Sequence, residues 1–217
     1  MGKKIQKISK IISEEGIFFF FLKIFKYINT NICGISKEII FEQDLEKSVP
    51  KITTELELSF RMASKEDIDF MDEEHYDYDL KGKQYSKDRL LKGDRCILTV
   101  YNGKIIGYTW VMKDYMELSQ FNHILLSKNR IYVYKGFILK EYRGKRIQMF
   151  VHKYLANMLR KEGKRFVVLF IDIKNKSSIK CVERVGFKRI GFKKQFTFFG
   201  LKHDYIKNKT LLYLQNP

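Results

Sequence analysis

The strongest constraint on the fold of this chain is a strand that runs into a long helix through a tight, basic turn. The strand ends in three apolar residues, Phe137, Ile138 and Leu139. The turn then carries three positive charges around one glycine and leads into the helix, as Arg143, Gly144, Lys145, Arg146 and Ile147. The first N–H groups of a helix lack intrahelical partners, and the helix dipole makes this end positive. The sequence therefore predicts a phosphate or pyrophosphate site at this turn.

The helix behind the turn is marked by one continuous apolar stripe. Between Gly144 and Gly163 the apolar residues recur three and one positions apart, at Ile147, Phe150, Val151, Tyr154, Leu155, Met158 and Leu159. This spacing predicts a helix with one buried face, and Gly163 fits the glycine that often ends a helix. The apolar run from Phe166 to Ile171 then reads as a fully buried strand.

A short second helix is predicted from Ser177 to Val185. Asn175 stands just before it and can cap its first turn, with Ser178 three positions on. Gly186 and Phe187 follow the helix, where glycine is an ordinary C-terminal cap.

The rest of the chain supplies further strands and a helix start. Alternating or β-rich runs predict strands at 37–44, 56–61, 96–101, 104–111, 130–139, 187–199 and 204–214. Asn102 and Gly103 separate two of these runs as a type I′ hairpin turn does. Ser64 and Asp67 resemble a capping box that opens a helix. We therefore expect an α/β fold, a mixed and mainly antiparallel sheet with helices on both faces. We expect a helix and strand extension over residues 1–56 and the main domain over 57–217.

The basic charge is concentrated in the half of the chain that holds the turn. The chain has a net charge of +17, and residues 128–209 hold 23 Lys and Arg against five Asp and Glu. Such a field attracts a polyanion, whether a cofactor, a nucleic acid or an anionic membrane. A solvated basic surface is the alternative. No motif of a known nucleic-acid-binding module appears, so we expect no nucleic acid as partner.

The potential metal ligands are few and scattered. The three cysteines and four histidines, Cys33, Cys96, Cys181, His75, His123, His152 and His203, show no metal-ligand spacing and no disulfide framework. We therefore predict no metal site and a reducing, cytoplasmic location.

The N-terminal residues 5–28 combine an apolar run, 17–22, with lysines on both sides. The run is too short to span a bilayer, and no signal-peptide cleavage site follows it. It can lie on an anionic membrane surface, which would make the protein membrane-peripheral. The alternative, which we prefer, is that it packs on its own domain or at the interface of a homodimer.

The order of elements and the residues 137–187 together resemble the GNAT superfamily of acyl-CoA-dependent N-acetyltransferases. The resemblance covers residues 57–215. The family fingerprint, Gln/Arg-x-x-Gly-x-Gly/Ala, falls on Arg143 to Gln148, and both of its glycines are replaced, by Arg146 and Gln148. Arg146 keeps its N–H and can also bond a phosphate oxygen through its side chain.

The resemblance implies acetyl-CoA, or another acyl-CoA, as co-substrate. Its pyrophosphate would sit on the turn Arg143, Gly144, Lys145, Arg146 and Ile147. The strand Phe137, Ile138 and Leu139 would pair with the pantetheine arm, and Asn175 and Ser178 would lie beside it. Many members place a tyrosine as general acid where this chain has Val182, beside Cys181. Catalytic candidates are therefore Tyr134, as acid or water relay, and Glu141. Aromatic core packing is the alternative for the tyrosine.

The resemblance further implies a bacterial enzyme that acetylates a primary amine of a small molecule in a direct ternary complex, with an amino sugar or sugar nucleotide as one acceptor class. An acidic stretch over residues 66–79 would attract a cationic amine, or it is simply a solvated helix face. Two other readings stay open. One is a binding or regulatory module that has lost turnover, and the other is a membrane-peripheral acyltransferase for longer acyl chains.

Overall fold

The computed structural model describes residues 33–48, 50, 53, 56–70, 82–112, 115–117, 123–199 and 201–208. The strands are β1 (Cys33–Asp44), β2 (Leu58–Met62), β3 (Arg95–Tyr101), β4 (Lys104–Met112), β5 (Tyr115–Glu117), β6 (His123–Leu125), β7 (Arg130–Ile138), β8 (Phe166–Asp172), β9 (Lys188–Phe198) and β10 (Leu201–Asn208). The helices are α2 (Lys65–Phe70), α3 (Gly82–Leu91), α4 (Ile147–Lys161) and α5 (Lys176–Arg184), with a 3₁₀ turn, η2, at Lys140–Tyr142.

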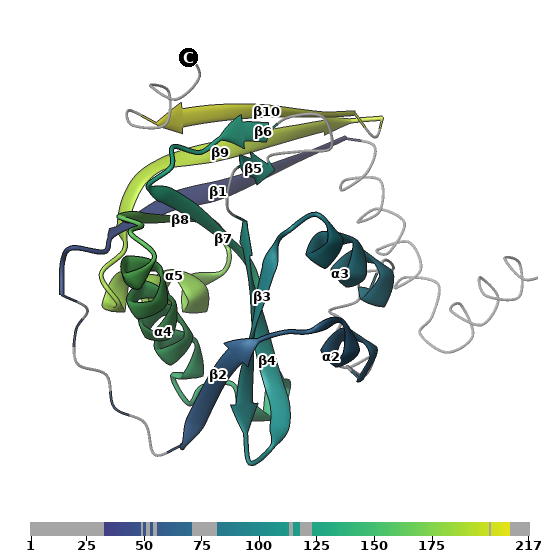
Figure 1. Cartoon of the computed structure of the whole chain (residues 1–217). Helices are drawn as coiled ribbons and strands as arrows, with labels where there is room; N and C mark the ends of the chain where they lie inside the picture. The colour runs from purple at the N-terminus through teal and green to yellow at the C-terminus, as the bar shows by residue number, and fades with distance from the viewer. Residues whose placement is uncertain are drawn as a thin grey trace, which may run out of the picture.

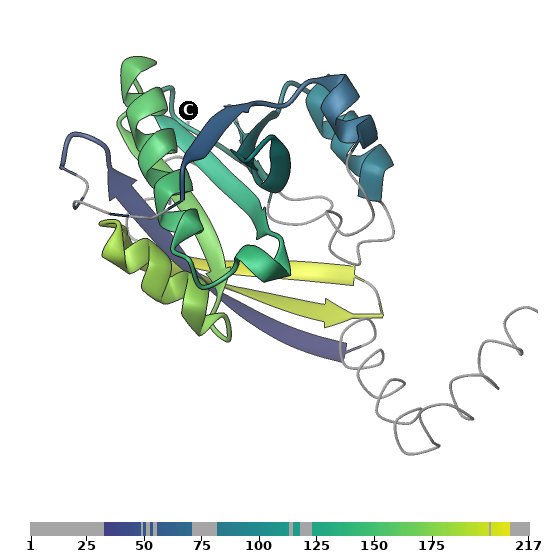
Figure 2. The ribbon, with the colours of Figure 1, turned by 90° about the horizontal axis from the view of Figure 1, so that it is seen from below.

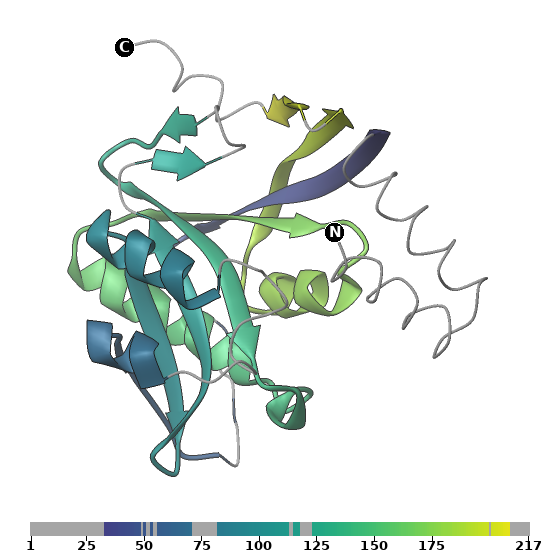
Figure 3. The same cartoon turned by 90° about the vertical axis from the view of Figure 1, so that its right-hand side faces the viewer.

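One mixed sheet carries the fold, in the strand order β10-β9-β1-β8-β7-β4-β3-β2 (Figure 1). Strands β7 and β8 run parallel, and the other neighbours are antiparallel. Helices α2 and α3 lie on one side of the sheet and α4 and α5 on the other (Figures 2 and 3). This is the predicted α/β class with helices on both faces.

Strand β1 lies inside the sheet, although the sequence places it in the N-terminal extension. It pairs with β8 from Glu38↔Asp172 to Asp44↔Phe166, and with β9 along its other edge. The division at residue 56 therefore does not separate two sheets, because β1 completes the sheet of the main domain. The N-terminal segment 5–28, for which a membrane surface or packing on its own domain was expected, lies outside the described residues.

The β3–β4 hairpin forms as the Asn-Gly pair predicts. Asn102 has a φ of 48° and Gly103 one of 76°. A type I′ turn needs positive φ at both central residues, which Asn and Gly tolerate best. The capping box also forms, since the Ser64 N–H donates to Asp67 Oδ2 at 2.7 Å and the Asp67 N–H donates to Ser64 Oγ at 3.3 Å.

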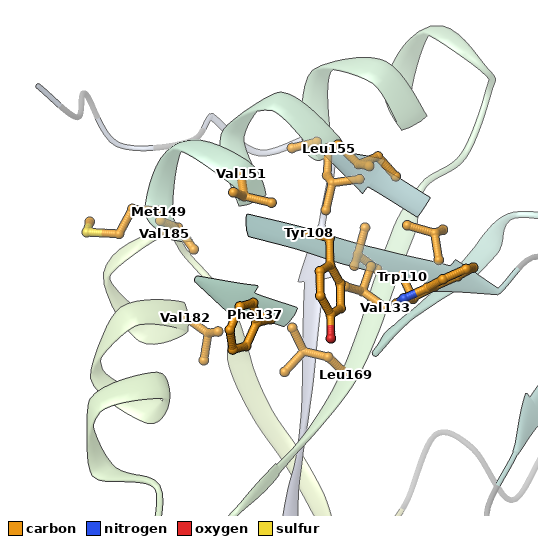
Figure 4. Close-up of a cluster of buried hydrophobic side chains, with 14 of the residues drawn as sticks. Tyr108, Trp110, Val133, Phe137, Met149, Val151, Leu155, Leu169, Val182 and Val185 are labelled. Carbon is orange, nitrogen blue, oxygen red and sulfur yellow. The ribbon is translucent and has the colours of Figure 1, made fainter. Parts of the chain in front are cut away.

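The main hydrophobic core lies between the sheet and the helices α4 and α5 (Figure 4). Helix α4 contributes Ile147, Met149, Val151, His152, Leu155, Ala156 and Leu159 as its buried residues. Three residues of the predicted stripe, Phe150, Tyr154 and Met158, are only half-buried, because the buried face is rotated toward Met149 and His152. Among the helices that the structure describes, none is long and apolar enough to cross a membrane.

Candidate functional site

The candidate site begins where β7 and β8 separate. They pair in parallel only from Arg130↔Phe166 to Tyr132↔Val168, yet β7 continues to Ile138 and β8 to Asp172. Beyond this point the β8-facing edge of β7 forms no ladder with β8. An open strand edge can accept an extended ligand arm as an added strand. The structure thus places the predicted Phe137, Ile138 and Leu139 at a fork in the sheet.

The basic turn after β7 forms a concave row of backbone N–H groups. Gly144 has a φ of 81° and Arg146 one of 60°, both left-handed. The helix starts only at Ile147, three residues later than the sequence predicts, because Arg146 is its non-helical N-cap. Of the described residues, none accepts a hydrogen bond from the N–H groups of Gly144 to Gln148. Alternating left-handed residues at a helix N-terminus make an anion-binding nest.

The charged side chains of this turn are exposed, and one of them is anchored. Arg143 Nε donates to the Ile138 carbonyl at 2.8 Å, and its guanidinium lies 5.6 Å from the centre of the Phe137 ring. Lys145 Nζ lies 5.3 Å from the Tyr142 ring. Arg146 has no such contact among the described residues. Its side chain is therefore available to an anion seated on the nest.

Gln148, which replaces the second fingerprint glycine, lies against a glycine of β7, Gly136. Lys135, with a φ of 47°, and Gly136 form a bulge, since Tyr108 pairs with Phe137 but Trp110 pairs with Tyr134. A Cβ built on Gly136 would lie 2.9 Å from Gln148 Nε2. Gln148 therefore reaches back over the bulge into the space that Gly136 leaves open.

Thr109 adds a second polar group beside this bulge. It is fully buried, and among the described residues its hydroxyl has no hydrogen-bond partner. The same built Cβ on Gly136 would lie 3.5 Å from Thr109 Oγ1. Sequence reasoning missed Gly136, Gln148 and Thr109 as a group, although a glycine inside a β-rich run is a signal for a bulge.

Asn175 caps α5, as its position predicts. Its Oδ1 accepts from the Ser178 N–H at 3.1 Å and from Ser177 Oγ at 3.0 Å. Its side chain is exposed, and its amide nitrogen donates to no described residue. Asn175 can therefore hold the helix start and still offer a donor to a ligand, while Ser178 takes part through its backbone.

The two predicted catalytic residues do not come together. Glu141 pairs with Lys104 Nζ at 3.5 Å, at the start of β4. Tyr134 pairs with Trp110, six residues further along β4. At about 3.3 Å per residue, these two positions on β4 are roughly 20 Å apart along the strand. A single proton relay between them is therefore not built into the fold.

The hydroxyl of Tyr134 is engaged in a buried polar network. It donates to Asp94 Oδ2 at 2.7 Å, and the buried Arg89 reaches the same carboxylate at 3.4 Å. Burial and the hydrogen bond to Asp94 raise the pKa of Tyr134 far above its ordinary value. The proton is held toward Asp94, so this geometry favours a structural role over that of a proton donor.

The residues at the family's general-acid position are also part of the core. Val182 is buried, and the half-buried Cys181 packs against the same cluster. Burial raises the pKa of the Cys181 thiol to about 11. The thiol is therefore protonated at neutral pH and is a poor nucleophile. Within the described ranges, no group of His, Cys, Asp and Glu side chains is arranged to hold a metal ion.

A row of aromatic side chains crosses the fork on its other side. Tyr134 stacks on Tyr132 with ring centres 5.7 Å apart, and Tyr132 contacts Phe170 of β8 at 5.4 Å. Lys193 of β9 lies over the Phe170 ring at 5.4 Å and pairs with Glu38 at 2.6 Å. This side therefore brings aromatic rings and both signs of charge close to the strand ends.

Comparison with known proteins agrees with this geometry. The model of the acetyltransferase (GNAT) family matches residues 55–187, which is more than half of the chain. No curated protein matches the sequence.

The fold resembles several solved structures at low sequence identity. A GNAT-family acetyltransferase from Colwellia psychrerythraea matches with a TM-score of 0.53 and 13% identity, over 82% of this chain and 62% of that one. A functionally unknown protein from Staphylococcus epidermidis ATCC 12228 gives 0.51 and 13%, over 88% and 67%. A glucosamine N-acetyltransferase region of a fungal multi-domain β-N-acetylglucosaminidase gives 0.55 and 12%, over 84% and 22%. At these identities the likeness is one of fold. By the match of the family model over residues 55–187, this chain belongs to the acetyltransferase (GNAT) family.

Proposed function

We propose that the protein is an N-acetyltransferase that uses acetyl-CoA, or another acyl-CoA, to acylate a primary amine of a small molecule. The observation that carries the proposal is the nest of free N–H groups from Gly144 to Gln148, placed beside the open edge of β7. A pyrophosphate and an extended arm are the two parts of coenzyme A that such a pair of features can bind together.

The chain's residues divide the binding as follows. The backbone of Gly144 to Gln148 would hold the pyrophosphate, with the Arg146 side chain as an added charge-assisted donor. Phe137, Ile138 and Leu139 would pair with the pantetheine arm, and Asn175 would donate to it. Bound acetyl-CoA would supply the thioester. The acceptor amine, once deprotonated, would attack it directly, with the proton required by the departing thiolate taken from water or the acceptor.

The aromatic side of the fork is the proposed acceptor site. The Tyr132 and Phe170 rings, tilted by 55° to each other, would border the acceptor. Glu38 lies at the same side of the fork, where it pairs with the buried Lys193, which also lies near the buried side chain of Asp204. Of the acidic stretch expected to attract an amine, Asp67 is already bound by Arg61 through two contacts of 2.6 Å, and residues 71–79 are outside the described part. Glucosamine is therefore the first acceptor to test, on the strength of these polar groups and of the fungal relative in fold.

The test is calorimetric titration of the full chain with acetyl-CoA, followed by an assay of thiol release with an amine panel. Arg146→Glu should weaken binding by about 100-fold or more, because it replaces a charge-assisted donor with a repelling carboxylate. Lys161→Glu, the same charge reversal at the exposed far end of α4, serves as control and should change binding little. Absence of acetyl-CoA binding by the unaltered protein would refute the proposal.

A second candidate is favoured by the engaged Tyr134 and the buried Val182, which leave the described site without an evident general acid. In this reading the protein binds an acyl-CoA as a regulatory or sensing module and does not turn it over. Tight acetyl-CoA binding with no thiol release for any amine would support it.

A further inference from the structure

The outer part of the sheet, farthest from the acetyl-CoA site's helix α4, exposes an unusual number of large apolar side chains. They are Ile35 of β1, Phe196 and Phe198 of β9, Phe199 in the turn, and Leu201 and Tyr205 of β10, and we call them the hairpin patch. Their exposed fractions range from 41% for Phe196 to 72% for Ile35. A contiguous exposed apolar patch on a folded protein usually marks an interaction surface.

The strand registers place the patch on one face and at one end of three neighbouring strands. Ile35 pairs with Phe196, and Phe198 pairs with Leu201. Directly paired residues of antiparallel strands lie on the same face. The β9–β10 turn and the start of β1 lie at the same end of the sheet, so the patch forms a projecting edge (Figures 1 and 2).

The charges around the patch are positive. Lys37 pairs with Lys194 on the same face, and Lys207 pairs with Phe192 there. No Asp or Glu lies on the described part of this face at this end of the three strands. The nearby acids Glu38 and Asp204 alternate to the opposite face, where they pair with Lys193. The sheet therefore separates an apolar, cationic face from a charge-balanced one.

We propose that the hairpin patch docks on an anionic lipid surface, with Phe198, Phe199 and Leu201 entering the interface and the lysines facing the headgroups. Apolar and aromatic side chains bordered by lysines bind such a surface through both burial and electrostatic attraction. The inference is independent of the proposed acetyl transfer, and it concerns a surface separate from the candidate site.

Charge favours an anionic lipid surface over two other partners for the hairpin patch, which are a second copy of the chain and its own residues 1–32. A second copy of the chain would bring one lysine-bordered face against another, and each chain carries a net charge of +17. The chain's own residues 1–32, which join β1 at the patch, carry six lysines and two glutamates and would also add like charge. An anionic surface instead gains from each of these charges.

The first test measures sedimentation of the full chain with phosphatidylcholine vesicles and with vesicles containing about one third phosphatidylserine. The unaltered protein should bind the anionic vesicles at least about tenfold more strongly, and less at high salt. Phe199→Asn with Leu201→Ser should reduce this binding by about tenfold or more. Asparagine suits the turn, because Phe199 has a φ of 45°.

A matched control removes two exposed apolar side chains from another surface. Met62→Ser with Leu91→Ser alters residues that are 40% and 69% exposed, and it should leave vesicle binding unchanged. Equal binding of the two double variants, or no preference for anionic vesicles, would overturn the proposal. A change of sedimentation coefficient in the hairpin variant without vesicles would instead identify a second copy as the occupant and would also overturn it.

A second measurement needs no substitution. Amide hydrogen exchange of the full chain should slow at residues 196–205 when anionic vesicles are added. Slowing confined to residues 1–32 would assign the membrane contact to the N-terminal segment and refute docking through the hairpin.

Discussion

The β3–β4 turn and the turn before α4 both adopt left-handed backbone, and they do so with very different residues. The β3–β4 turn uses Asn102 and Gly103, which adopt positive φ at little cost. The turn before α4 uses Gly144 and then Arg146, whose φ of 60° costs about 1–2 kcal/mol for a residue with a Cβ. The first turn follows local preference, whereas the second keeps a strained residue among N–H groups that no described residue accepts from. Strain of this kind persists when the surrounding structure over-determines it, and it is frequent at binding sites.

The first prediction concerns the stability of α4, whose packing holds the second turn in place. Burial lowers the pKa of His152 in α4 to about 4. The unfolded chain takes up a proton below about pH 6.5, whereas the folded chain resists it down to about pH 4, so stability falls as the pH drops through this window. Between pH 7.5 and 5 this group should cost about 2 kcal/mol of unfolding free energy.

Urea denaturation at the two pH values measures this loss. The variant His152→Phe should lose that part of the pH dependence, because it has no proton to bind. If the variant and the unaltered protein lose stability equally on acidification, then His152 is not the group that makes the fold acid-sensitive.

A matched pair of glycine substitutions tests whether both turns affect stability but only one affects acetyl-CoA binding. Gly103 and Gly144 both have positive φ, and an added Cβ would meet nothing within 4 Å at either position. Gly103→Ala and Gly144→Ala should therefore each cost about 1–2 kcal/mol of stability from backbone strain alone. Only Gly144→Ala should weaken acetyl-CoA binding, as seen by calorimetry, because only that turn shapes the nest. Equal effects on binding would mean that the nest is not the anion site.

The smallest effect, and the most specific, concerns Arg146 itself. Arg146→Gly should raise the unfolding free energy by about 0.5–1 kcal/mol, since relief of the left-handed strain exceeds the entropy cost of glycine. The same change should weaken acetyl-CoA binding by about tenfold, because a charge-assisted donor is lost. Asn102→Gly is the control and should alter neither quantity by more than a few tenths of a kcal/mol. A variant that binds acetyl-CoA as tightly as the unaltered protein would show that Arg146 is not a phosphate ligand.

Local signals in the sequence predicted local structure well. The Asn-Gly pair gave the hairpin, the apolar stripe gave α4, and Asn175 gave the cap of α5, because each depends on residues a few positions apart. The start of α4 was misplaced, since an arginine in left-handed backbone runs against residue preference.

Features that depend on residues far apart in the sequence could not be predicted from local patterns. Tyr134 was predicted as a catalytic candidate, yet its role depends on Asp94, forty positions away, and no periodicity encodes that contact. The reach of Gln148 to the bulge at Gly136 is of the same kind. The sequence located the basic turn before α4, while the surroundings of the individual side chains required the fold.

The position of β1 has a consequence for how the chain assembles. Asp44 pairs with Phe166 and Cys33 with Phe198, so the first described strand finds both neighbours roughly 120–165 residues further along. During synthesis β1 is made before β8 and β9, so it stays unpaired and rich in apolar residues until these two strands have been made. Closure of the sheet is therefore a step of high contact order, and until it occurs β1 exposes the unpaired backbone groups through which strands aggregate.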